Sequence, residues 1–459
     1  MLCAPHELEE GAKDGAQQLH FHVSHDPGYF SNSQVIRKLW ESLFQMSKHW
    51  FNMDSTQYPP SVFNAATYIA PDAIFKVTKD YLADTDPRKV NVGAGTYRDE
   101  NGKPWILPSV RMAKEVVANA GHEYSPILGL KLFRDRTVEL AFQGMKALKE
   151  DRIASCQSLS GTGALLLAGL ALKKAESGIT EVLITEPTWS NHELLFSSMG
   201  YNVTKLPYYK AGAFDFRSYI DALKSAPSGA AVILHTCAHN PTGCDPSQEQ
   251  WKEIAAVMKK KTMFPVFDSA YLGFNSGVVY DDAWAIRYFV DELGFEASVC
   301  LSFAKSMGLY GERVGVVTFV ASSSELAQTM VSILENVQRA TVSTPPIYGA
   351  NIAATVLGTP EIAKQWAQDL ITMSSRVKGM RQKLFDALVR LQTPGDWSHI
   401  VKQTGMFGYT GISSAQIVYL QDKYHVYMAN TSRISIAGLN DSNVEYFAKA
   451  LDDAVRSVK

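Results

Sequence analysis

The fold is decided by residues 301–315, which have the sequence LSFAKSMGLYGERVG. The apolar run at 299–303 predicts a buried strand that ends in a turn punctuated by glycine. Lys305 comes just past that strand, and Arg313 stands before a second strand pattern at 314–320. In an open α/β sheet, ligands bind beyond the carboxyl ends of the strands. Taken alone, the stretch still favours a structural interpretation, with Lys305 as a solvated loop lysine and Arg313 as a surface charge.

Composition excludes several classes of function. The chain has 459 residues, of which 46% are hydrophobic and 20% charged, as expected for a soluble globular protein with a large core. A formal net charge of -2 gives no support for a nucleic-acid surface or a polybasic membrane anchor. No apolar run approaches the roughly 20 residues that a membrane span needs. The 5 cysteines form no CxxC pair, which argues against a disulfide framework or a zinc site, so no metal is expected.

The beginning of the chain differs from the rest. Residues 1–33 are polar and contain His20, His22 and His25, but no further ligands stand nearby, so a flexible tail is favoured over a metal site. Residues 35–50 carry apolar side chains at helical spacing. The acidic start has the pattern of neither a secretory signal nor a mitochondrial presequence. The cytoplasm is therefore favoured over the mitochondrion.

From about residue 62 onward, strand patterns and helix patterns alternate. Further strands are expected at 181–185, 231–235 and 263–267. The side chains that follow the ends of these strands and of the strand at 299–303 are Trp189, Asn240, Asp268, Tyr271 and Lys305. Because the carboxyl ends of parallel strands meet at one edge, these side chains should converge. The pattern predicts an α/β fold with a mainly parallel sheet and helices on both faces.

The segment Ser160-Gly161-Thr162 leads directly into a helix pattern at 164–174. A helix N-terminus with free N–H groups and hydroxyl donors can bind an anion. The alternative is simple N-capping by a serine or threonine, and the sequence leaves both open. Asp245 is expected to cap another helix, which should run to about residue 259.

This set of residue types is typical of pyridoxal phosphate binding. Lys305 would form the Schiff base, and Asp268 would partner the pyridinium nitrogen. Tyr271 and Asn240 would hydrogen-bond the phenolate oxygen of the ring, and Trp189 would stack on its face. The phosphate would be held by Ser160, Gly161, Thr162, Ser302 and Arg313.

The chain resembles the aspartate aminotransferase family of the eukaryotic type. The matching motifs, in the family's order and spacing, are SLSGTGAL, EPTWSNH, HTCAHNPTGCDP, FDSAYLGF, SFAKSMGLYGERVG, STPPIYGA and SRISIAGL. The resemblance implies the fold of transferases that depend on pyridoxal phosphate. A large cofactor-binding domain is expected at 102–368, and a smaller α/β domain would combine 61–101 with 369–459. Residues 1–60 would be an extension.

The resemblance also implies roles that composition cannot reveal. Arg433 matches the arginine that binds the substrate α-carboxylate, and Gly95 lies in the segment that closes over substrate. Arg339 matches the arginine that a neighbouring subunit contributes to the distal carboxylate. Tyr124 and Ser343 match residues that cross the same subunit interface, Tyr124 toward the cofactor phosphate. A homodimer with shared active sites is therefore expected.

The implied reaction transfers the amino group of L-aspartate to 2-oxoglutarate, giving oxaloacetate and L-glutamate, in ping-pong order through a pyridoxamine form. Small dicarboxylic amino acids and 2-oxo acids are the expected partners, without nucleic acid or membrane. His192 matches a histidine beneath Asp268, and His239 lies in the same layer; for both, plain core packing is an equal alternative.

This chain departs from its relatives at Ala304, where many have serine, and at Val342, where many have tryptophan near the substrate entrance. Two alternatives to the implied reaction stay open. One is a broader-specificity aromatic or kynurenine-type aminotransferase, which Val342 would favour. The other is a non-catalytic binding protein, against which the intact Lys305, Asp268 and Arg433 argue.

Overall fold

The structure is a computed structural model that describes Glu41, residues 61–70 and residues 73–458. The chain divides into two compact units, 1–70 and 71–459. In the first, residues 62–65 form a turn in which the amide of Ala66 donates to the carbonyl of Phe63. The predicted tail and the expected helix at 35–50 lie outside the described residues, apart from Glu41. Within the described part of the chain, no helix has the length and apolarity to cross a bilayer.

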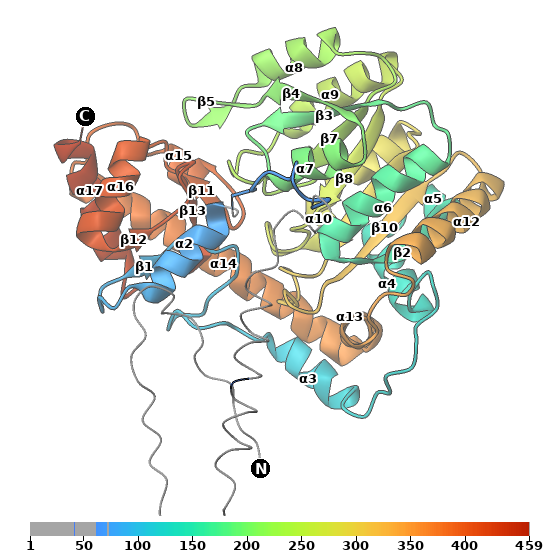
Figure 1. Ribbon diagram of the computed structural model, residues 1–459, viewed down its shortest axis with the longest axis horizontal. Coiled ribbons are helices and arrows are strands. Elements are labelled where there is room, and N and C mark those ends of the chain that lie inside the picture. Colours follow the sequence, from blue (N-terminus) through green and yellow to red (C-terminus); the bar gives the residue numbers. More distant parts are fainter. Residues whose placement is uncertain (1–40, 42–60, 71–72, 459) are drawn as a thin grey trace, which may run out of the picture. The chain divides into compact units, whose positions relative to one another are not determined.

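The second unit is built on a seven-stranded sheet with the order β2-β10-β9-β8-β7-β3-β4 (Figure 1). The strands are β2 (Ile153–Leu159), β3 (Glu181–Glu186), β4 (Asn202–Pro207), β7 (Ala231–His235), β8 (Phe264–Ser269), β9 (Ala297–Ser302) and β10 (Val314–Val320). β10 runs antiparallel to β2 and β9, and the neighbouring pairs from β9 to β4 are parallel. The predicted mainly parallel sheet is confirmed.

Successive strand residues face two separate hydrophobic cores. In β3, Val182 and Ile184 belong to one core and Leu183 to the other. One face is covered by α6 (Ser160–Lys174), α7 (Asn191–Ser198) and α12 (Ser324–Thr341), and the other by helices that include α4 (Lys131–Ala141) and α9 (Gln248–Lys260). Because side chains alternate along a strand, a sheet covered on both faces gives strands that are apolar almost throughout. The expected α/β fold with helices on both faces is confirmed.

Seven further helices and a short hairpin complete the part of the second unit that surrounds the sheet. These helices are α3 (Pro108–Val116), α5 (Lys146–Lys149), α8 (Phe216–Ser225), α10 (Val279–Asp282), α11 (Trp284–Arg287), η2 (Tyr288–Glu292) and α13 (Tyr348–Gly358). β5 (Tyr209–Lys210) and β6 (Ala213–Phe214) form a short hairpin. α13 packs against both α3 and α4, which precede it by more than 200 residues in the sequence.

The C-terminal part of the chain packs on an early segment. α2 (Ala73–Ala83) contacts β12 (Val426–Tyr427), which pairs in parallel with β1 (Val90–Asn91). Figure 1 shows the blue α2 beside the red C-terminal elements. The other elements here are α14 (Pro360–Arg390), α15 (His399–Lys402), β11 (Phe407–Tyr409), α16 (Ser414–Tyr424), β13 (Arg433–Ser435), η3 (Ile436–Gly438) and α17 (Val444–Ser457). The division at 368/369 stays a prediction; α14 passes through that position without a break.

One expected helix start is wrong. α9 is capped by Ser247, whose hydroxyl accepts from the amide of Gln250 in a capping box, and Asp245 stands outside the helix. The carboxylate of Asp245 instead accepts hydrogen bonds from the amides of Ala238 and His239, at 2.7 and 2.8 Å. Asp245 therefore holds the turn after β7. Its hydrogen bonds to the amides of this turn replace the helix cap that its residue type favours locally.

Candidate active site

A cavity of about 180 Å³ opens where the sheet strands end. Five strands deliver residues to it from their carboxyl ends, and the antiparallel β10 delivers one from just before its start. The lining residues are Ser160, Gly161, Thr162, Trp189, His235, Asn240, Asp268, Ala270, Tyr271, Ser302, Lys305 and Arg313. Apart from Tyr124, every residue predicted to bind the cofactor is in this set. The strand-end pattern therefore brings these side chains together in one place.

Lys305 lies in the turn that follows β9, and its side chain is partly buried. Its Nζ is 5.1 Å from the centre of the Tyr271 ring. Burial lowers the pKa of Lys305, because it disfavours the charged form; Asp268 opposes this effect, and the positive charges of Arg313 and Arg433 add to it. The net pKa shift is downward. A buried amine with a lowered pKa is a suitable nucleophile and proton carrier.

Asp268 is the buried carboxylate of the cavity. Its Oδ2 lies 3.0 Å from Nε2 of His192, and Nδ1 of His192 lies 2.8 Å from the hydroxyl of Thr188. Burial by itself would raise the pKa of Asp268. The hydrogen bond from His192 and the electrostatic interactions with His192, His235 and Lys305 outweigh burial, so the net pKa is lowered. Asp268 is thus kept as an anion facing the cavity.

The two histidines whose roles were open in the sequence have different surroundings. His192 contacts Asp268 directly, whereas His239 bonds the hydroxyls of Thr185 and Thr242 at 2.9 and 2.8 Å. The ring of His239 also stacks on Tyr208, with 4.0 Å between the ring centres. The core-packing interpretation therefore holds for His239, while His192 is placed to tune the carboxylate.

His235 is a cavity residue that sequence reasoning missed. It ends β7, lines the cavity, and its ring centre is 5.1 Å from that of His192. Burial is the main reason that the pKa of His235 is lowered to about 3, so the imidazole is neutral at physiological pH. A polar residue that ends the apolar strand AVILH could have been found by the same strand-end argument that selected Asp268.

His192, His235 and Asp268 also offer ligand atoms that lie within 4.8 Å of one another. That spacing would suit a metal ion, but Nε2 of His192 already bonds the carboxylate. The cavity that His235 and Asp268 line is also lined by Lys305 and Arg313. An amine and a guanidinium group have no function around a metal ion, since neither charged group is a ligand.

The start of α6 forms the polar wall of the cavity. Ser160 adopts a positive φ of 60°, and its hydroxyl lies 2.7 Å from that of Ser302. A Cβ added at Gly161 would lie 3.4 Å from the Cβ of Ser302, which places this glycine directly against Ser302. The residue before the helix is Leu159, which makes no side-chain capping bond. The simple N-capping alternative is therefore wrong, and the free amides of the first turn face the cavity region.

Arg313 closes the polar wall from the other side. It precedes β10 with a φ of 52°, and its Nη1 donates to the carbonyl of Tyr310 at 3.1 Å. Partial burial lowers the pKa of Arg313, although the group stays charged. Ala304 stands where many relatives have serine. Its backbone amide donates to the hydroxyl of Ser302 at 3.2 Å. The hydroxyl of Ser302 thus contacts both the backbone of the turn after β9 and Ser160 in the polar wall.

A second cavity of about 330 Å³ shares Trp189 and Asn240 with the first and brings in Arg433. Trp189 meets the ring of His192 edge to face, at 5.3 Å between ring centres. Arg433 lies on β13, is 5% exposed, and its Nη2 donates to the carbonyl of Gly93 at 2.8 Å. Its guanidinium carbon lies 4.2 Å from the centre of the Phe407 ring. A buried guanidinium group therefore stands next to the cavity of Lys305.

Besides Arg433, four predicted site residues do not line the cavity of Lys305. Gly95 lies on the loop after β1, two residues from the carbonyl that Arg433 contacts. Tyr124 is 85% exposed, and Arg339 is exposed and donates a hydrogen bond to the hydroxyl of Ser343. Tyr124, Arg339 and Ser343 are the residues that the family resemblance assigns to a neighbouring subunit, and a single chain cannot place them in its own site.

Comparison with known proteins identifies the class. A family model described as "Aminotransferase class I and II" matches residues 87–451. The chain belongs to this family. It is 47% identical to the cytoplasmic aspartate aminotransferase of Schizosaccharomyces pombe, over 84% of this chain and 96% of that protein. It is 42% identical to the cytoplasmic aspartate aminotransferase of Gallus gallus, over 87% of this chain and 99% of that protein.

Solved structures agree with this assignment. The cytoplasmic aspartate aminotransferase of Saccharomyces cerevisiae superposes with a TM-score of 0.84 and is 41% identical, covering 87% of this chain and 99% of that chain. An aromatic-amino-acid aminotransferase from Burkholderia pseudomallei, covalently bound to pyridoxal phosphate, superposes with a TM-score of 0.83. It is 35% identical and covers 86% of this chain and 100% of its own.

Proposed function

We propose that this protein is an aspartate aminotransferase that uses pyridoxal phosphate. It would transfer the amino group of L-aspartate to 2-oxoglutarate, giving oxaloacetate and L-glutamate, and the first product would leave before the second substrate binds. The observation that carries the proposal is the convergence of Lys305, Asp268 and the polar wall of Ser160 and Arg313 on one cavity. The curated relatives named above support the choice of aspartate.

The residues of the cavity fit this cofactor. A cofactor with an aldehyde, a basic ring nitrogen and a phosphate needs an amine, a carboxylate and an anion site, and the cavity holds one of each. The anion site is the first turn of α6 with Ser160, Thr162 and Arg313. When bound, the cofactor supplies an electron sink that stabilises negative charge at the substrate Cα. Asp268, held as an anion by His192, would keep the ring nitrogen protonated.

The chain's own residues then have distinct tasks. Lys305 would hold the cofactor between turnovers and, once released, would carry the proton between Cα and the neighbouring carbon of the cofactor. Its lowered pKa favours the neutral amine, which is the form that accepts that proton. Tyr271 and Asn240 would hydrogen-bond the ring hydroxyl oxygen, and Trp189 would cover the ring face. Arg433 would bind the α-carboxylate through its planar fork.

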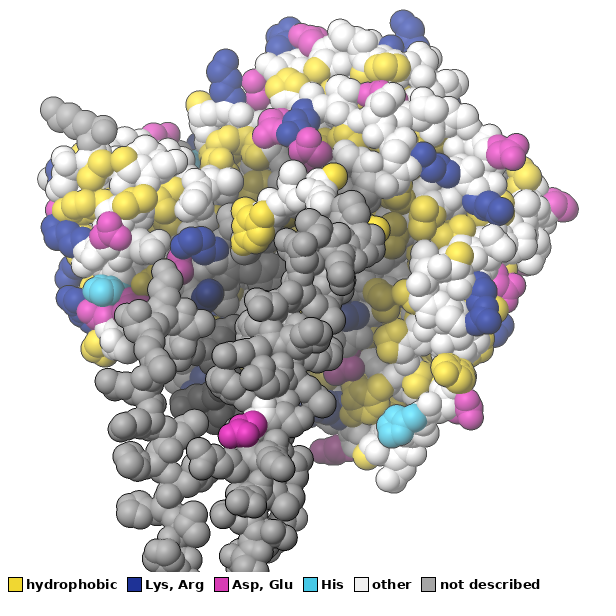
Figure 2. All heavy atoms as spheres, viewed as in Figure 1, with side chains coloured by type: hydrophobic (Ala, Val, Ile, Leu, Met, Phe, Trp, Pro, Cys, Tyr) yellow, Lys and Arg dark blue, Asp and Glu magenta, His cyan; other side chains and the backbone are white. Residues whose placement is uncertain are grey.

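We further propose a homodimer in which Tyr124, Arg339 and Ser343 serve the partner's site. Large apolar side chains are exposed on the three helices that pack together near Tyr124. These are Met112 and Val116 of α3, Leu132 of α4 and Tyr348 of α13, with exposed fractions of 38%, 66%, 53% and 36%. Figure 2 shows hydrophobic side chains in yellow over this lower part of the molecule. An exposed apolar patch of this kind favours a subunit contact.

A mixed dimer tests the shared sites. Lys305→Ala and Arg339→Ala homodimers should each be nearly inactive toward aspartate. Hybrids formed by mixing them should regain activity, because one of their two sites receives an intact lysine and an intact arginine. Mixing Lys305→Ala with Arg433→Ala should give no gain, because each site takes both of those residues from the same chain. Lack of recovery in the first mixture would contradict sharing of Arg339.

A spectrum tests the proposed reaction. The protein bound to pyridoxal phosphate should show a visible absorption band that aspartate removes and 2-oxoglutarate restores. Steady-state kcat/KM should then be higher for aspartate than for phenylalanine. A band that aspartate leaves unchanged would contradict the proposal, and so would a preference for phenylalanine. The cytoplasm is the proposed location, in keeping with the relatives named cytoplasmic.

A second candidate is a broader-specificity aminotransferase that also takes aromatic amino acids. Val342 lies next to Ser343 in the segment that carries Arg339, and it is 36% exposed. A valine leaves more room than the tryptophan of many relatives. The broad-specificity aminotransferase of Leishmania mexicana also superposes, with a TM-score of 0.82 at 35% identity. Val342→Trp should reduce kcat/KM for phenylalanine more than for aspartate if Val342 widens the site.

A further inference from the structure

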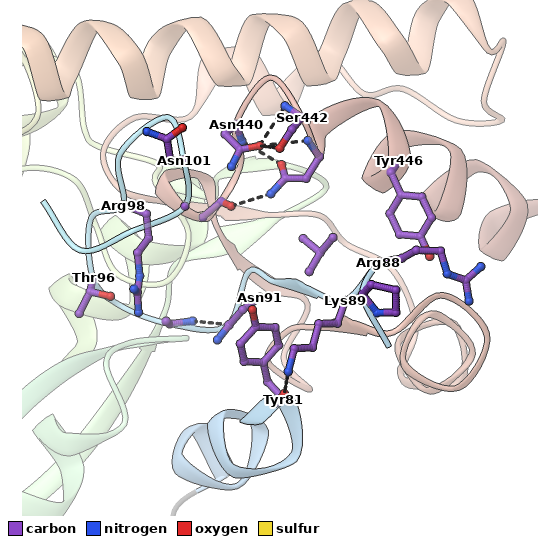
Figure 3. Close-up of a pocket in the computed structure, with 16 residues that line it drawn as sticks. Tyr81, Arg88, Lys89, Asn91, Thr96, Arg98, Asn101, Asn440, Ser442 and Tyr446 are labelled. Carbon is purple, nitrogen blue, oxygen red and sulfur yellow. Dashed lines mark hydrogen bonds between the residues drawn. The ribbon is translucent and has the colours of Figure 1, made fainter. Parts of the chain in front are cut away.

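A polar pocket of about 460 Å³ lies away from Lys305, between the loop after β1 and the start of α17. Its volume falls in the range of about 300–1,000 Å³ that small-molecule sites occupy. Figure 3 shows Thr96 and Arg98 along one wall, Asn440 and Ser442 on the loop before α17, and Tyr81 and Lys89 at the other end. The pocket shares no lining residue with the cavity of Lys305.

The pocket is rich in positive charge. Three cationic residues line it, and none of its described lining residues is acidic. Arg88 pairs with Asp86 at 2.7 Å, so its charge is balanced. Lys89 donates to the carbonyls of Tyr81 and Asp84, at 2.9 and 2.5 Å, and makes no ion pair with a described carboxylate. Among the described residues, its charge is therefore compensated by backbone dipoles and by the Tyr81 ring, whose centre lies 4.5 Å from Nζ, and not by a carboxylate.

Arg98 is the cation whose surroundings indicate a ligand. Within the described residues its guanidinium group makes neither a hydrogen bond nor an ion pair, although the side chain is only partly exposed. Beside it, the hydroxyl of Thr96 is buried and has no hydrogen-bond partner in the part of the chain that the structure describes. Native structures leave few buried polar groups unpaired, and each such group calls for an explanation. An anion with several oxygen atoms would satisfy both groups.

The remaining walls add donors. Asn440 uses its side-chain oxygen for the amides of Ser442 and Asn443, at 3.0 Å each, which leaves its amide nitrogen for a ligand. The same loop leads into α17, whose N-terminus contributes a positive potential. Asn91 uses its side-chain oxygen in the same way, for the amides of Gly93 and Ala94. These side-chain amides add uncharged donors to the cations that line the pocket.

The pocket wall is connected to the proposed substrate site. The side chain of Asn91 holds the turn at Gly93 and Ala94, and the carbonyl of Gly93 accepts the hydrogen bond from Arg433. A ligand that joins Arg98 and Thr96 to the loop of Asn440 would fix this turn. The turn would then hold Arg433 in the position that receives a carboxylate.

We propose that this pocket is a regulatory site for a compact oxyanion, either a phosphate group or a small polycarboxylate, and that its occupation tightens amino-acid binding at Arg433. The binding part stands on the pocket alone. The coupling part rests on the proposed role of Arg433 in substrate binding. By linkage, amino-acid substrate should also tighten binding of the anion.

Calorimetric titration of the protein loaded with pyridoxal phosphate tests the binding part. Inorganic phosphate and citrate serve as probes, and the tighter of the two identifies the phosphate or the carboxylate source. Arg98→Gln should weaken binding of the preferred probe by about tenfold or more, since a charged donor is lost. Arg88→Gln is the matched control and should change binding by less than about twofold, because Arg88 is already paired. Equal binding by the wild type and Arg98→Gln, or binding of neither probe, would overturn the site.

Initial rates test the coupling part. The preferred probe should lower the KM for aspartate several-fold in the wild type, with kcat unchanged. In Arg98→Gln, the same probe should leave KM unchanged or raise it by competition at the substrate arginines. Calorimetric binding that depends on Arg98 without any effect on KM would reject the coupling and keep the site. An enzyme inactive toward aspartate would reject the proposed function, and the titration would still decide the pocket.

Discussion

Replacing Arg433 with lysine tests the proposed substrate site most directly. The substitution keeps the positive charge but removes the planar fork, so the two donors that face a carboxylate become one ammonium group. In the wild type, Nη2 of Arg433 donates to Gly93 at 2.8 Å, and the guanidinium group packs 4.2 Å from the Phe407 ring. These contacts fix the direction of the fork. A lysine side chain cannot reproduce both the contact with Gly93 and a paired contact with substrate.

The loss can be estimated from the bond that disappears. A hydrogen bond to a charged group contributes about 1.5–3 kcal/mol. Because every 1.4 kcal/mol corresponds to a factor of ten, Arg433→Lys should lower kcat/KM by about 10- to 150-fold. The loss should be similar for aspartate and for alanine, since both substrates carry the α-carboxylate. A matched loss is the signature of a residue that recognises what all amino acids share.

The control is a second buried arginine. Arg381 is 2% exposed, and it donates to the carbonyls of Ile400, Thr404 and Gly405 at 3.0, 3.1 and 2.9 Å. Arg381→Lys should therefore lower the thermal midpoint while leaving the KM for aspartate nearly unchanged. Steady-state kinetics of both variants with aspartate and alanine decide the matter. A loss under about threefold in Arg433→Lys, or a loss confined to aspartate, would refute the assignment of the α-carboxylate to Arg433.

Further substitutions address the other proposed roles. Arg339→Leu should lower kcat/KM for aspartate by about 100-fold and leave alanine within a few-fold, because only aspartate has a distal carboxylate; an equal loss for both would contradict this role. Lys305→Met should reduce transamination by more than about 1,000-fold in a coupled assay. Burial lowers the pKa of Lys305 in the folded, cofactor-free protein below that in the unfolded chain. Between these two pKa values the unfolded chain binds more protons at this residue, so the contribution of Lys305 to thermal stability should rise with pH. Lys305→Met should lack that rise, and identical profiles of thermal midpoint against pH for the variant and the wild type would contradict a lowered pKa of Lys305. Asp245→Ala should cost about 2–4 kcal/mol in denaturant unfolding, since three donors within 2.9 Å lose their acceptor, whereas the exposed Asp386→Ala should stay within about 0.5 kcal/mol.

The cofactor side of the site could be predicted from the sequence because it follows one geometric rule. The pattern at 231–235 matches β7 and the pattern at 314–320 matches β10, whereas the pattern at 263–267 ends two residues before β8 does and that at 299–303 ends one residue after β9 does. Once the ends are placed, the parallel arrangement brings Asp268 and Lys305 to one edge. His235 escaped notice because it belongs to the apolar run itself, although it obeys the same rule.

The substrate side could not be derived in this way. Arg433 lies on the three-residue strand β13, which is too short to give a periodic pattern. Only the resemblance to known aminotransferases pointed to it. Asp245 shows a second limit, because its carboxylate serves amides of the turn after β7 and not the helix that follows it in sequence. Competition between local and tertiary partners is decided by the fold, and local sequence carries no record of it.

The charges of the site connect ligand binding with the basicity of Lys305. Arg313 and Arg433 both lower the pKa of Lys305, while Asp268 raises it. A phosphate group on Arg313 and a carboxylate on Arg433 would neutralise the two guanidinium groups and remove much of their effect. The pKa of Lys305 should then rise as the site fills, leaving burial as the main cause that lowers it. The amine would thus be most easily deprotonated before anions bind and would become a stronger base once they are in place, which is when the proposed proton transfer requires it.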